Sequence, residues 1–88
     1  MQQDDMVQIF DARGLKCPLP VLKARRLIRA MEPGKVLEVQ ATDPGAPGDF
    51  EHFCQTTGHR LLGSETAGDT FVIRIQVADL PTTAAADQ

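Results

Sequence analysis

The stretch "GLKCPLPVLKARRLIRAMEPG" at residues 14–34 decides how the chain folds. Its apolar residues recur at the spacing of one helix face: Val21, Ala24, Leu27, Ile28 and Met31. Most of its basic residues fall on the other side of that helix: Lys23, Arg25, Arg26 and Arg29. The glutamate, proline and glycine at 32–34 end the pattern. The sequence therefore predicts an amphipathic helix over 18–31 that packs one side against another layer.

Two prolines spaced one residue apart set the beginning of this helix. A residue before proline is pushed out of the α region, so Cys17 suits the non-helical N-cap position. Pro18 then takes the first helical position and Pro20 lies in the first turn, where neither removes an intrahelical hydrogen bond. Leu19 keeps a backbone N–H that is free to point at the Cys17 sulfur. The prolines are thus expected to fix the position of the sulfur.

Segments on both sides of the helix have the pattern of β-strands. Residues 7–12, "VQIFDA", alternate between apolar and polar, and 35–42, "KVLEVQAT", form a second short strand. Residues 59–66, "HRLLGSET", and 70–78, "TFVIRIQVA", are interpreted as two strands joined by "AGD", which is a hairpin signal. The sequence therefore predicts four strands, of which the last two form a hairpin.

A second helix is expected from about residue 47 to residue 57. Its apolar residues lie three and four positions apart: Phe50, Phe53 and Cys54. Asp49 or the residues just before it could cap the beginning of this helix, and Gly58 ends it. The preceding "DPGAPGD" at 43–49 is rich in turn residues, and its glycine spacing fits no P-loop or dinucleotide fingerprint.

The predicted elements alternate in the order β-α-β-α-β-β. Helices that alternate with the strands of one sheet give an α+β fold, here a two-layer α/β sandwich. We expect a four-stranded mixed sheet with two helices on one face. A single domain covers 7–78, and the segments 1–6 and 79–88 are expected to be flexible tails.

Composition and charge narrow the possible functions. The 88 residues suit one domain, and the 42% apolar and 24% charged residues are typical of a globular protein. No apolar run approaches the roughly 18 residues that a membrane span needs. The first residues are acidic and polar, unlike a signal peptide, so we expect a cytoplasmic protein with no membrane association. A net charge of −3 argues against direct nucleic-acid binding.

The two cysteines invite different interpretations. Cys54 lies on the apolar side of the second helix, so we expect it to be packing in the core. Without a Cys-x-x-Cys pair, a thioredoxin-type dithiol site is excluded. His52, Cys54 and His59 cannot face one ion while that helix persists, so no metal site and no cofactor are expected.

The surroundings of Cys17 suggest a reactive thiol. The positive end of the helix dipole, together with Lys16 and Arg13, favours thiolate, so the sequence predicts a lowered pKa for Cys17. A hydrolytic cysteine needs a histidine base, and sequence alone brings no histidine to Cys17. Two prolines without N–H groups exclude a rhodanese-type loop. An exposed thiolate on a rigid turn fits a carrier better than a self-sufficient catalyst.

The segment "DARGLKCPLP" at 11–20 resembles the signature of the TusA-like (SirA-type) sulfur-carrier family, a Cys-Pro-x-Pro after Gly-Leu. Similar pieces follow in "MEPG" at 31–34, "DP" at 43–44 and "FC" at 53–54, so that the resemblance covers about 7–77. It implies a two-layer sandwich in which a cysteine at the beginning of the first helix carries sulfur.

The resemblance also implies a role for Cys17, which would carry sulfane sulfur as a persulfide. A donor such as a cysteine desulfurase or a rhodanese-like protein loads it, and a downstream acceptor protein takes it. Family members serve tRNA thiolation, sulfur oxidation or molybdenum-cofactor metabolism. Leu19 replaces the acidic residue that some members carry between the prolines, which makes the mouth of the site less negative. A small relay that docks on two partners is expected to be a monomer, and to be a sulfurtransferase only as part of a relay.

The clustered basic residues carry one further hypothesis and its alternative. Between residues 13 and 29 the chain has six basic residues and no acid. Partner docking is assigned to Lys23, Arg26 and Arg29, and support of the site to Arg13, Lys16, Pro18 and Pro20. The alternative is a non-enzymatic regulatory or nucleic-acid-binding module that uses the same basic helix, and its function would survive Cys17→Ser. Asp11 either orients the Cys17 loop or only ends a strand.

Overall fold

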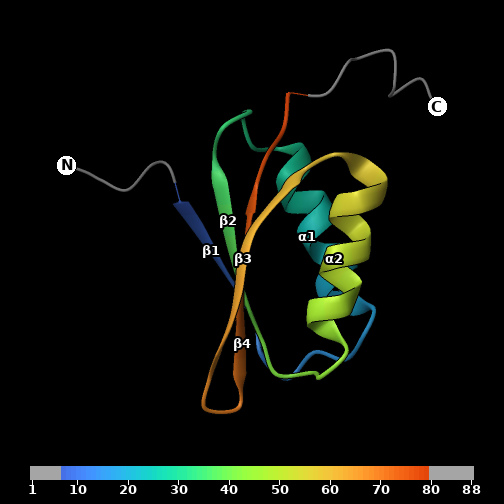
Figure 1. The fold of residues 1–88 in the computed structure, drawn as a ribbon, viewed down its shortest axis with the longest axis vertical. Helices are drawn as coiled ribbons and strands as arrows, with labels where there is room; N and C mark the ends of the chain where they lie inside the picture. Colours follow the sequence, from blue (N-terminus) through green and yellow to red (C-terminus); the bar gives the residue numbers. More distant parts are fainter. Residues whose placement is uncertain (1–6, 80–88) are drawn as a thin grey trace.

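A computed structural model describes residues 7–79 and contains the six predicted elements in the predicted order (Figure 1). The elements are β1 (Val7–Ala12), α1 (Leu19–Arg29), β2 (Val36–Ala41), α2 (Ala46–Thr57), β3 (Arg60–Ala67) and β4 (Thr70–Gln76). Every boundary lies within two residues of its predicted place. The predicted tails fall outside the described residues, apart from Asp79.

The sheet is mixed, as predicted, with the strand order β1-β2-β4-β3. β1 and β2 are parallel and in register from Val7 opposite Val36 to Ala12 opposite Ala41. β4 runs antiparallel to both β2 and β3. Because parallel strands end at the same edge of a sheet, the loops that follow β1 and β2 lie next to each other.

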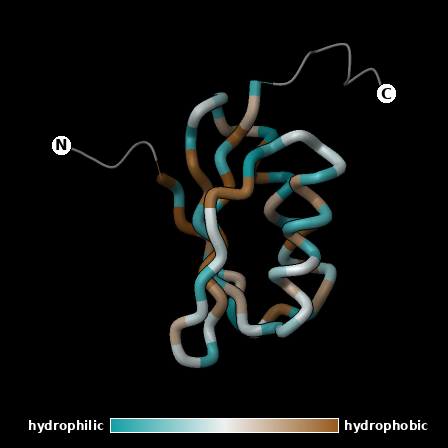
Figure 2. The backbone as a smooth tube through the Cα atoms, viewed as in Figure 1, coloured by the Kyte–Doolittle hydropathy of each residue, from teal (hydrophilic) through white to brown (hydrophobic). Residues whose placement is uncertain are grey.

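Both helices cover the same face of the sheet, and the core lies between the two layers (Figure 1). Alternate residues of β2 and β4 point toward the helices and are fully buried: Leu37, Val39, Ala41, Ile73 and Ile75. The most hydrophobic stretches of the backbone are in the strands, whereas the helices alternate in character (Figure 2). The predicted two-layer sandwich is confirmed.

Helix α1 packs the predicted apolar side against the sheet. Pro20, Ala24 and Ile28 are buried at intervals of four residues, which places them on one face. Val21, Leu27 and Met31 are half-buried against the same core. The four basic residues of the helix are all exposed. The amphipathic pattern thus positions α1 with its basic side toward solvent.

Helix α2 places Phe50, Phe53 and Cys54 in the core, as predicted. Phe50 and Phe53 meet edge to face, with their ring centroids 6.4 Å apart. Gly58 ends the helix in the left-handed conformation, with φ of 93°, and its N–H donates to the carbonyl of Cys54 over 2.9 Å. Among the described residues, no helix is long and apolar enough to cross a membrane.

Candidate functional site

Cys17 lies at the end of the molecule where both helices begin. It follows the loop after β1, and the loop after β2 leads past it into α2. The backbone N–H of Cys17 donates to Oδ2 of Asp43 over 2.6 Å, and its thiol donates to Oδ2 of Asp49. The side chain is exposed. The site therefore combines a solvent-accessible thiol with two carboxylates from the second βα unit.

The loop that carries Cys17 is held by one local hydrogen bond and one to the end of β2. The N–H of Leu15 donates to the carbonyl of Ala12 over 3.1 Å, and the N–H of Gly14 donates to Oγ1 of Thr42 over 2.9 Å. Gly14 has φ of 85°, a conformation that other residues adopt only with strain. The "GLKC" segment is thus fixed against the end of β2.

Asp43 joins the two loops of the site through one carboxylate. Its Oδ1 accepts the N–H of Gly45 over 2.9 Å, and its Oδ2 accepts the N–H of Cys17. These backbone hydrogen bonds, first that from Cys17 and then that from Gly45, lower the pKa of Asp43. A charged carboxylate at this position therefore fixes the backbone at Cys17 and at the beginning of α2.

The beginning of α1 differs from the prediction by one residue. Pro18 occupies the N-cap and Leu19 the first helical position, so Cys17 precedes the cap. The cause is the hydrogen bond from the N–H of Leu19 to the carbonyl of Lys16 over 2.8 Å, which closes a turn ahead of the helix. That N–H is therefore not free to reach the Cys17 sulfur. Pro20 lies in the first turn, as predicted, and is fully buried.

The predicted lowering of the Cys17 pKa is wrong. The thiol donates to the Asp49 carboxylate, and an acceptor of that kind favours the protonated form. Together with desolvation and the negative charges of Asp49 and Asp43, this hydrogen bond raises the pKa of Cys17 to about 11. In this structure Cys17 is a protonated thiol at neutral pH, not a thiolate.

The basic residues next to Cys17 act on other groups. Arg13 forms an exposed ion pair with Asp11, 2.8 Å between Nε and Oδ1. The charge of Lys16 lowers the pKa of Asp43 instead. The expectation that both residues would favour the thiolate fails because the charged groups that shift the pKa of Cys17 are Asp49 and Asp43, and both raise it. Asp49, which could have capped α2, contacts the thiol while Gly45 occupies the N-cap.

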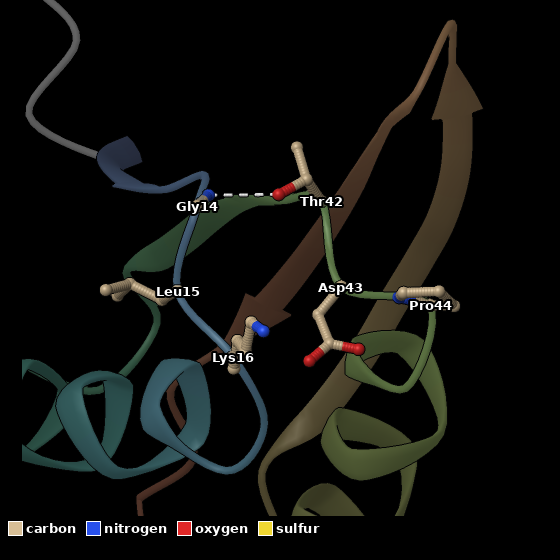
Figure 3. A pocket seen from close by; sticks show the side chains of 6 residues that line it. All are labelled: Gly14, Leu15, Lys16, Thr42, Asp43 and Pro44. Carbon is tan, nitrogen blue, oxygen red and sulfur yellow. Dashed lines mark hydrogen bonds between the residues drawn. The ribbon is translucent and has the colours of Figure 1, made fainter.

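A surface pocket of about 470 Å³ lies between the loop that precedes Cys17 and the loop that precedes α2. Its walls come from the loops after β1 and β2: Gly14, Leu15, Lys16, Thr42, Asp43 and Pro44. Figure 3 shows the side chains of Lys16 and Asp43 facing each other across it. Gly45 borders the thiol itself, since a Cβ placed there would lie 4.0 Å from the Cys17 sulfur. The pocket thus carries charges of both signs, and Lys16 and Asp43 of its lining are respectively the chain neighbour and the backbone hydrogen-bond partner of Cys17.

A stripe of exposed residues runs along α1 from the end at which Cys17 lies. At 100° per residue its members fall within an arc of about 120° on the side opposite the buried face: Leu19, Leu22, Lys23, Arg26 and Arg29. The two leucines are exposed by 43% and 51%, which is high for apolar residues. The docking residues predicted from the sequence therefore share one face, and two exposed leucines lie between them and the thiol.

Cys54 and His59 lie away from the thiol of Cys17. Cys54 is 6% exposed and belongs to the core, as predicted. His59 follows the far end of α2, and its Nδ1 accepts the N–H of Ala78 over 3.0 Å. The hydrogen-bond partners found for Cys17 are aspartates, so a cysteine–histidine pair does not describe this site.

Comparison with known proteins assigns the family. The family model described as sulfurtransferase TusA matches residues 8–77. The chain belongs to this family. Membership in the TusA family confirms the resemblance and places the protein among sulfur carriers.

Individual relatives agree with the assignment. Sulfur carrier protein TusA of Allochromatium vinosum is 48% identical over 67 residues, which cover 76% of this chain and 88% of that protein. A "putative sulfur carrier protein" of Neisseria meningitidis serogroup A is 49% identical over 69 residues, covering 78% and 93%. The crystal structure of a SirA-like protein from Desulfitobacterium hafniense superposes with a TM-score of 0.72 and 21% identity. It covers 84% of this chain and all of that chain, and it supports the TusA-family fold.

The sequence interpretation missed Asp43 and Asp49 as site residues and treated their segment as turn chemistry. A signal was available in the predicted fold. Parallel strands joined by a helix end at one edge of the sheet, so the loops after 7–12 and 35–42 must meet there. The predicted fold therefore already implied that the acidic segment 43–49 lies next to the loop of Cys17.

Proposed function

We propose that this protein accepts sulfane sulfur as a persulfide on Cys17 and passes it to a cysteine of a downstream protein. Its membership in a sulfur-carrier family supports sulfur as the cargo. The observation that carries the proposal is the contrast between the two thiols, because Cys17 is exposed at the meeting point of the helices while Cys54 is buried. The carrier thiol is therefore Cys17.

The chemistry is two successive sulfur transfers with no redox cofactor. In loading, the Cys17 sulfur attacks the outer sulfur of a persulfide on the donor, a cysteine desulfurase or a rhodanese-like protein. The donor S–S bond breaks, the donor leaves as a thiolate, and the Cys17 proton is released. In unloading, an acceptor thiolate attacks the outer sulfur on Cys17, the S–S bond to Cys17 breaks, and the Cys17 sulfur leaves as a thiolate that takes up a proton. Both steps need an exposed sulfur that a second protein can approach in line.

Partners are proposed to dock on the stripe along α1. The exposed leucines give apolar contact close to the thiol, and Lys23, Arg26 and Arg29 add positive charge further along. Charged patches of this kind accelerate encounter with an acidic partner and make association sensitive to salt. The donor surface is therefore expected to be acidic and partly apolar.

Intact mass spectrometry tests the carrier role. The protein is incubated with a cysteine desulfurase and cysteine, or with a rhodanese and thiosulfate, beside Cys17→Ser and Cys54→Ser. We expect a reductant-sensitive gain of one sulfur atom in the wild type and in Cys54→Ser, and none in Cys17→Ser. Equal gains in Cys17→Ser, or no gain from any competent donor, contradict the proposal.

Charge reversal tests the docking surface. Arg26→Glu with Arg29→Glu is expected to slow loading from the desulfurase by at least tenfold at low salt, because the encounter loses its electrostatic attraction. The control is Arg60→Glu, an exposed arginine on β3 outside the stripe. Loading that is unchanged by the double reversal removes the stripe from the docking surface and leaves the role of Cys17 intact.

A further inference from the structure

Three charged residues neighbour Cys17 in the described part of the chain, two through hydrogen bonds and one in sequence. Asp49 lies in the first turn of α2, Asp43 in the loop after β2, and Lys16 immediately before Cys17. Asp43 accepts a backbone N–H on each of its oxygens, from Gly45 and from Cys17. Asp49 differs, because its Oδ2 accepts the hydrogen bond of the thiol itself. Of the two carboxylates, Asp49 is the one that contacts the reacting atom.

This contact poses a chemical problem for sulfur transfer. The thiolate, not the thiol, is the nucleophile. The hydrogen bond to Asp49 raises the pKa of Cys17 to about 11, so that roughly 0.03% of the sulfur is ionised at pH 7.5. Sulfur transfer that proceeded only through this small thiolate fraction would be slow. The proton must therefore leave the sulfur as the attack takes place, and the atom that already accepts a hydrogen bond from the thiol is Asp49 Oδ2.

We propose that Asp49 is the general base of the loading step and accepts the Cys17 proton as the sulfur attacks the donor persulfide. This inference rests on the proposed carrier function. A carboxylate within hydrogen-bond reach of the proton it removes meets the geometric requirement for such a base. Asp43, whose oxygens are held by the backbone, acts only in positioning.

The step balances as follows. The Cys17 S–H bond breaks and its proton moves to Asp49 Oδ2, while the Cys17 sulfur forms a bond to the outer sulfur of the donor persulfide. The donor S–S bond breaks, and its electron pair stays on the donor sulfur as a thiolate. That thiolate then takes the proton from Asp49. The carboxylate is regenerated, one sulfane sulfur has moved, and no external oxidant or reductant is consumed.

The variant Asp49→Asn separates a base from a group that only suppresses ionisation. Loss of the carboxylate removes the first cause of the raised pKa of Cys17 and lowers that pKa by up to about two units, which raises the thiolate fraction by up to about a hundredfold. The less basic sulfur is roughly tenfold less nucleophilic. If Asp49 only suppresses, single-turnover loading from a persulfidated desulfurase becomes about tenfold faster. If Asp49 is the base, loss of about 10²- to 10⁴-fold assistance makes loading about 10- to 10³-fold slower.

The matched control is Glu51→Gln, which makes the same charge change on an exposed side chain of the same helix. Its loading rate is expected to equal that of the wild type. Asp49→Glu keeps a carboxylate one methylene farther out and is expected to recover part of the rate. Loading by Asp49→Asn that equals or exceeds the wild-type rate overturns the assignment.

Thiolate absorbance at 240 nm gives a second readout that needs no sulfur donor. Each titration is recorded as the difference from the matching protein that also carries Cys17→Ser, which removes the contribution of Cys54. The midpoint is expected near 11 in the wild type and in Glu51→Gln, and up to about two units lower in Asp49→Asn. An unchanged midpoint in Asp49→Asn shows that the contact is absent and overturns the inference, whereas a wild type that takes up no sulfur refutes the carrier function.

Discussion

The two cysteines of this chain have similar acidities for different physical reasons. The pKa of each thiol is raised to about 11. For Cys54 the cause is burial in the core, where no charged form is solvated. For Cys17, which is exposed, the first cause is the hydrogen bond to Asp49. Equal acidity thus arises once from burial alone and once chiefly from a hydrogen bond to a carboxylate.

A protonated thiol can react only when its proton has somewhere to go. A thiol suppressed by burial is released only when the surrounding helix opens, which costs much of the stability of the domain. A thiol suppressed by one carboxylate is released by moving one proton over a hydrogen bond. The pKa alone would rank the two cysteines as equally inert. The position of the proton acceptor separates the carrier thiol from the packing residue.

The largest expected effect is on alkylation by iodoacetamide in the native and the unfolded protein. Unfolding in guanidinium at pH 8 removes the Asp49 contact and is expected to raise the Cys17 rate only about tenfold, because increased ionisation is partly offset by lower nucleophilicity. The Cys54 rate is expected to rise by about a thousandfold or more, since native reaction requires opening of α2. Peptide mass spectrometry measures both. Native Cys54 labelling at a rate close to that of Cys17 would break the comparison.

The second effect is a pH-dependent loss of stability from Cys54. Its folded pKa of about 11 lies above the reference value of 9.0, so the unfolded chain loses its proton first as the pH rises. The associated stability is complete below pH 9 and is lost as the pH rises from about 9 to 11. Its size is on the order of 2 kcal/mol. Denaturant unfolding at pH 8 and pH 10.5 should show a smaller loss for Cys54→Ala than for the wild type, and equal losses would contradict a buried thiol.

The fold was largely predictable because its patterns are local. The helical spacing of Ala24 and Ile28, and the alternation of residues 35–42, each identify the face that must be buried. Once both helices have one apolar face, a two-layer sandwich is the arrangement that covers them. Boundaries shifted by a residue where a turn intervened, as at Pro18, whose position depends on a hydrogen bond one turn earlier.

The site was only half predictable because its electrostatics are not local. The position of Cys17 beside Pro18 follows from neighbouring residues, and so does its exposure at a helix start. Its protonation state depends on Asp49, which is 32 residues away in sequence and reaches the thiol only through the parallel pairing of β1 and β2. The nearby cations Arg13 and Lys16 suggested a lowered pKa for Cys17, whereas the pKa is raised. Charges counted along the chain therefore do not predict the protonation state of a residue at a place where two βα loops meet.

A third effect concerns the stability of the serine variants at neutral pH. Cys54→Ser places a hydroxyl in an apolar core and is expected to lower the free energy of unfolding by about 1–2 kcal/mol. A partial hydrogen bond back to the helix carbonyl of Phe50 limits the cost. Cys17→Ser is exposed and should change stability by less than about 0.5 kcal/mol. Thermal melts of both variants test this, and a larger loss for Cys17→Ser would mean that the loop, not the core, depends on its cysteine.

The smallest effect is expected from the ion pair at the beginning of the Cys17 loop. Arg13 donates to Asp11 through its backbone N–H, Nε and Nη2, and these contacts lower the pKa of Asp11 to about 2. The pair is exposed, so its net effect on stability is small. What it contributes is present above about pH 4 and is lost as the pH falls toward 2. We expect Asp11→Asn to shift the melting temperature by roughly 2 °C or less at neutral pH. The difference in melting temperature between the wild type and the variant should become smaller still in acid.

The same variant decides whether Asp11 has a role in the site. Because suppression of Cys17 is assigned to Asp49, Asp11→Asn should leave the rate of Cys17 alkylation within about twofold of the wild type, whereas Asp49→Asn should raise the thiolate fraction by up to about a hundredfold. Both substitutions remove one negative charge, Asp11→Asn near the end of β1 and Asp49→Asn in the first turn of α2. Each variant therefore serves as the control for the other. A change in alkylation of tenfold or more in Asp11→Asn would show that Asp11 orients the loop that holds the thiol. The acidity of Cys17 would then depend on where the loop places the sulfur, and not on one carboxylate alone.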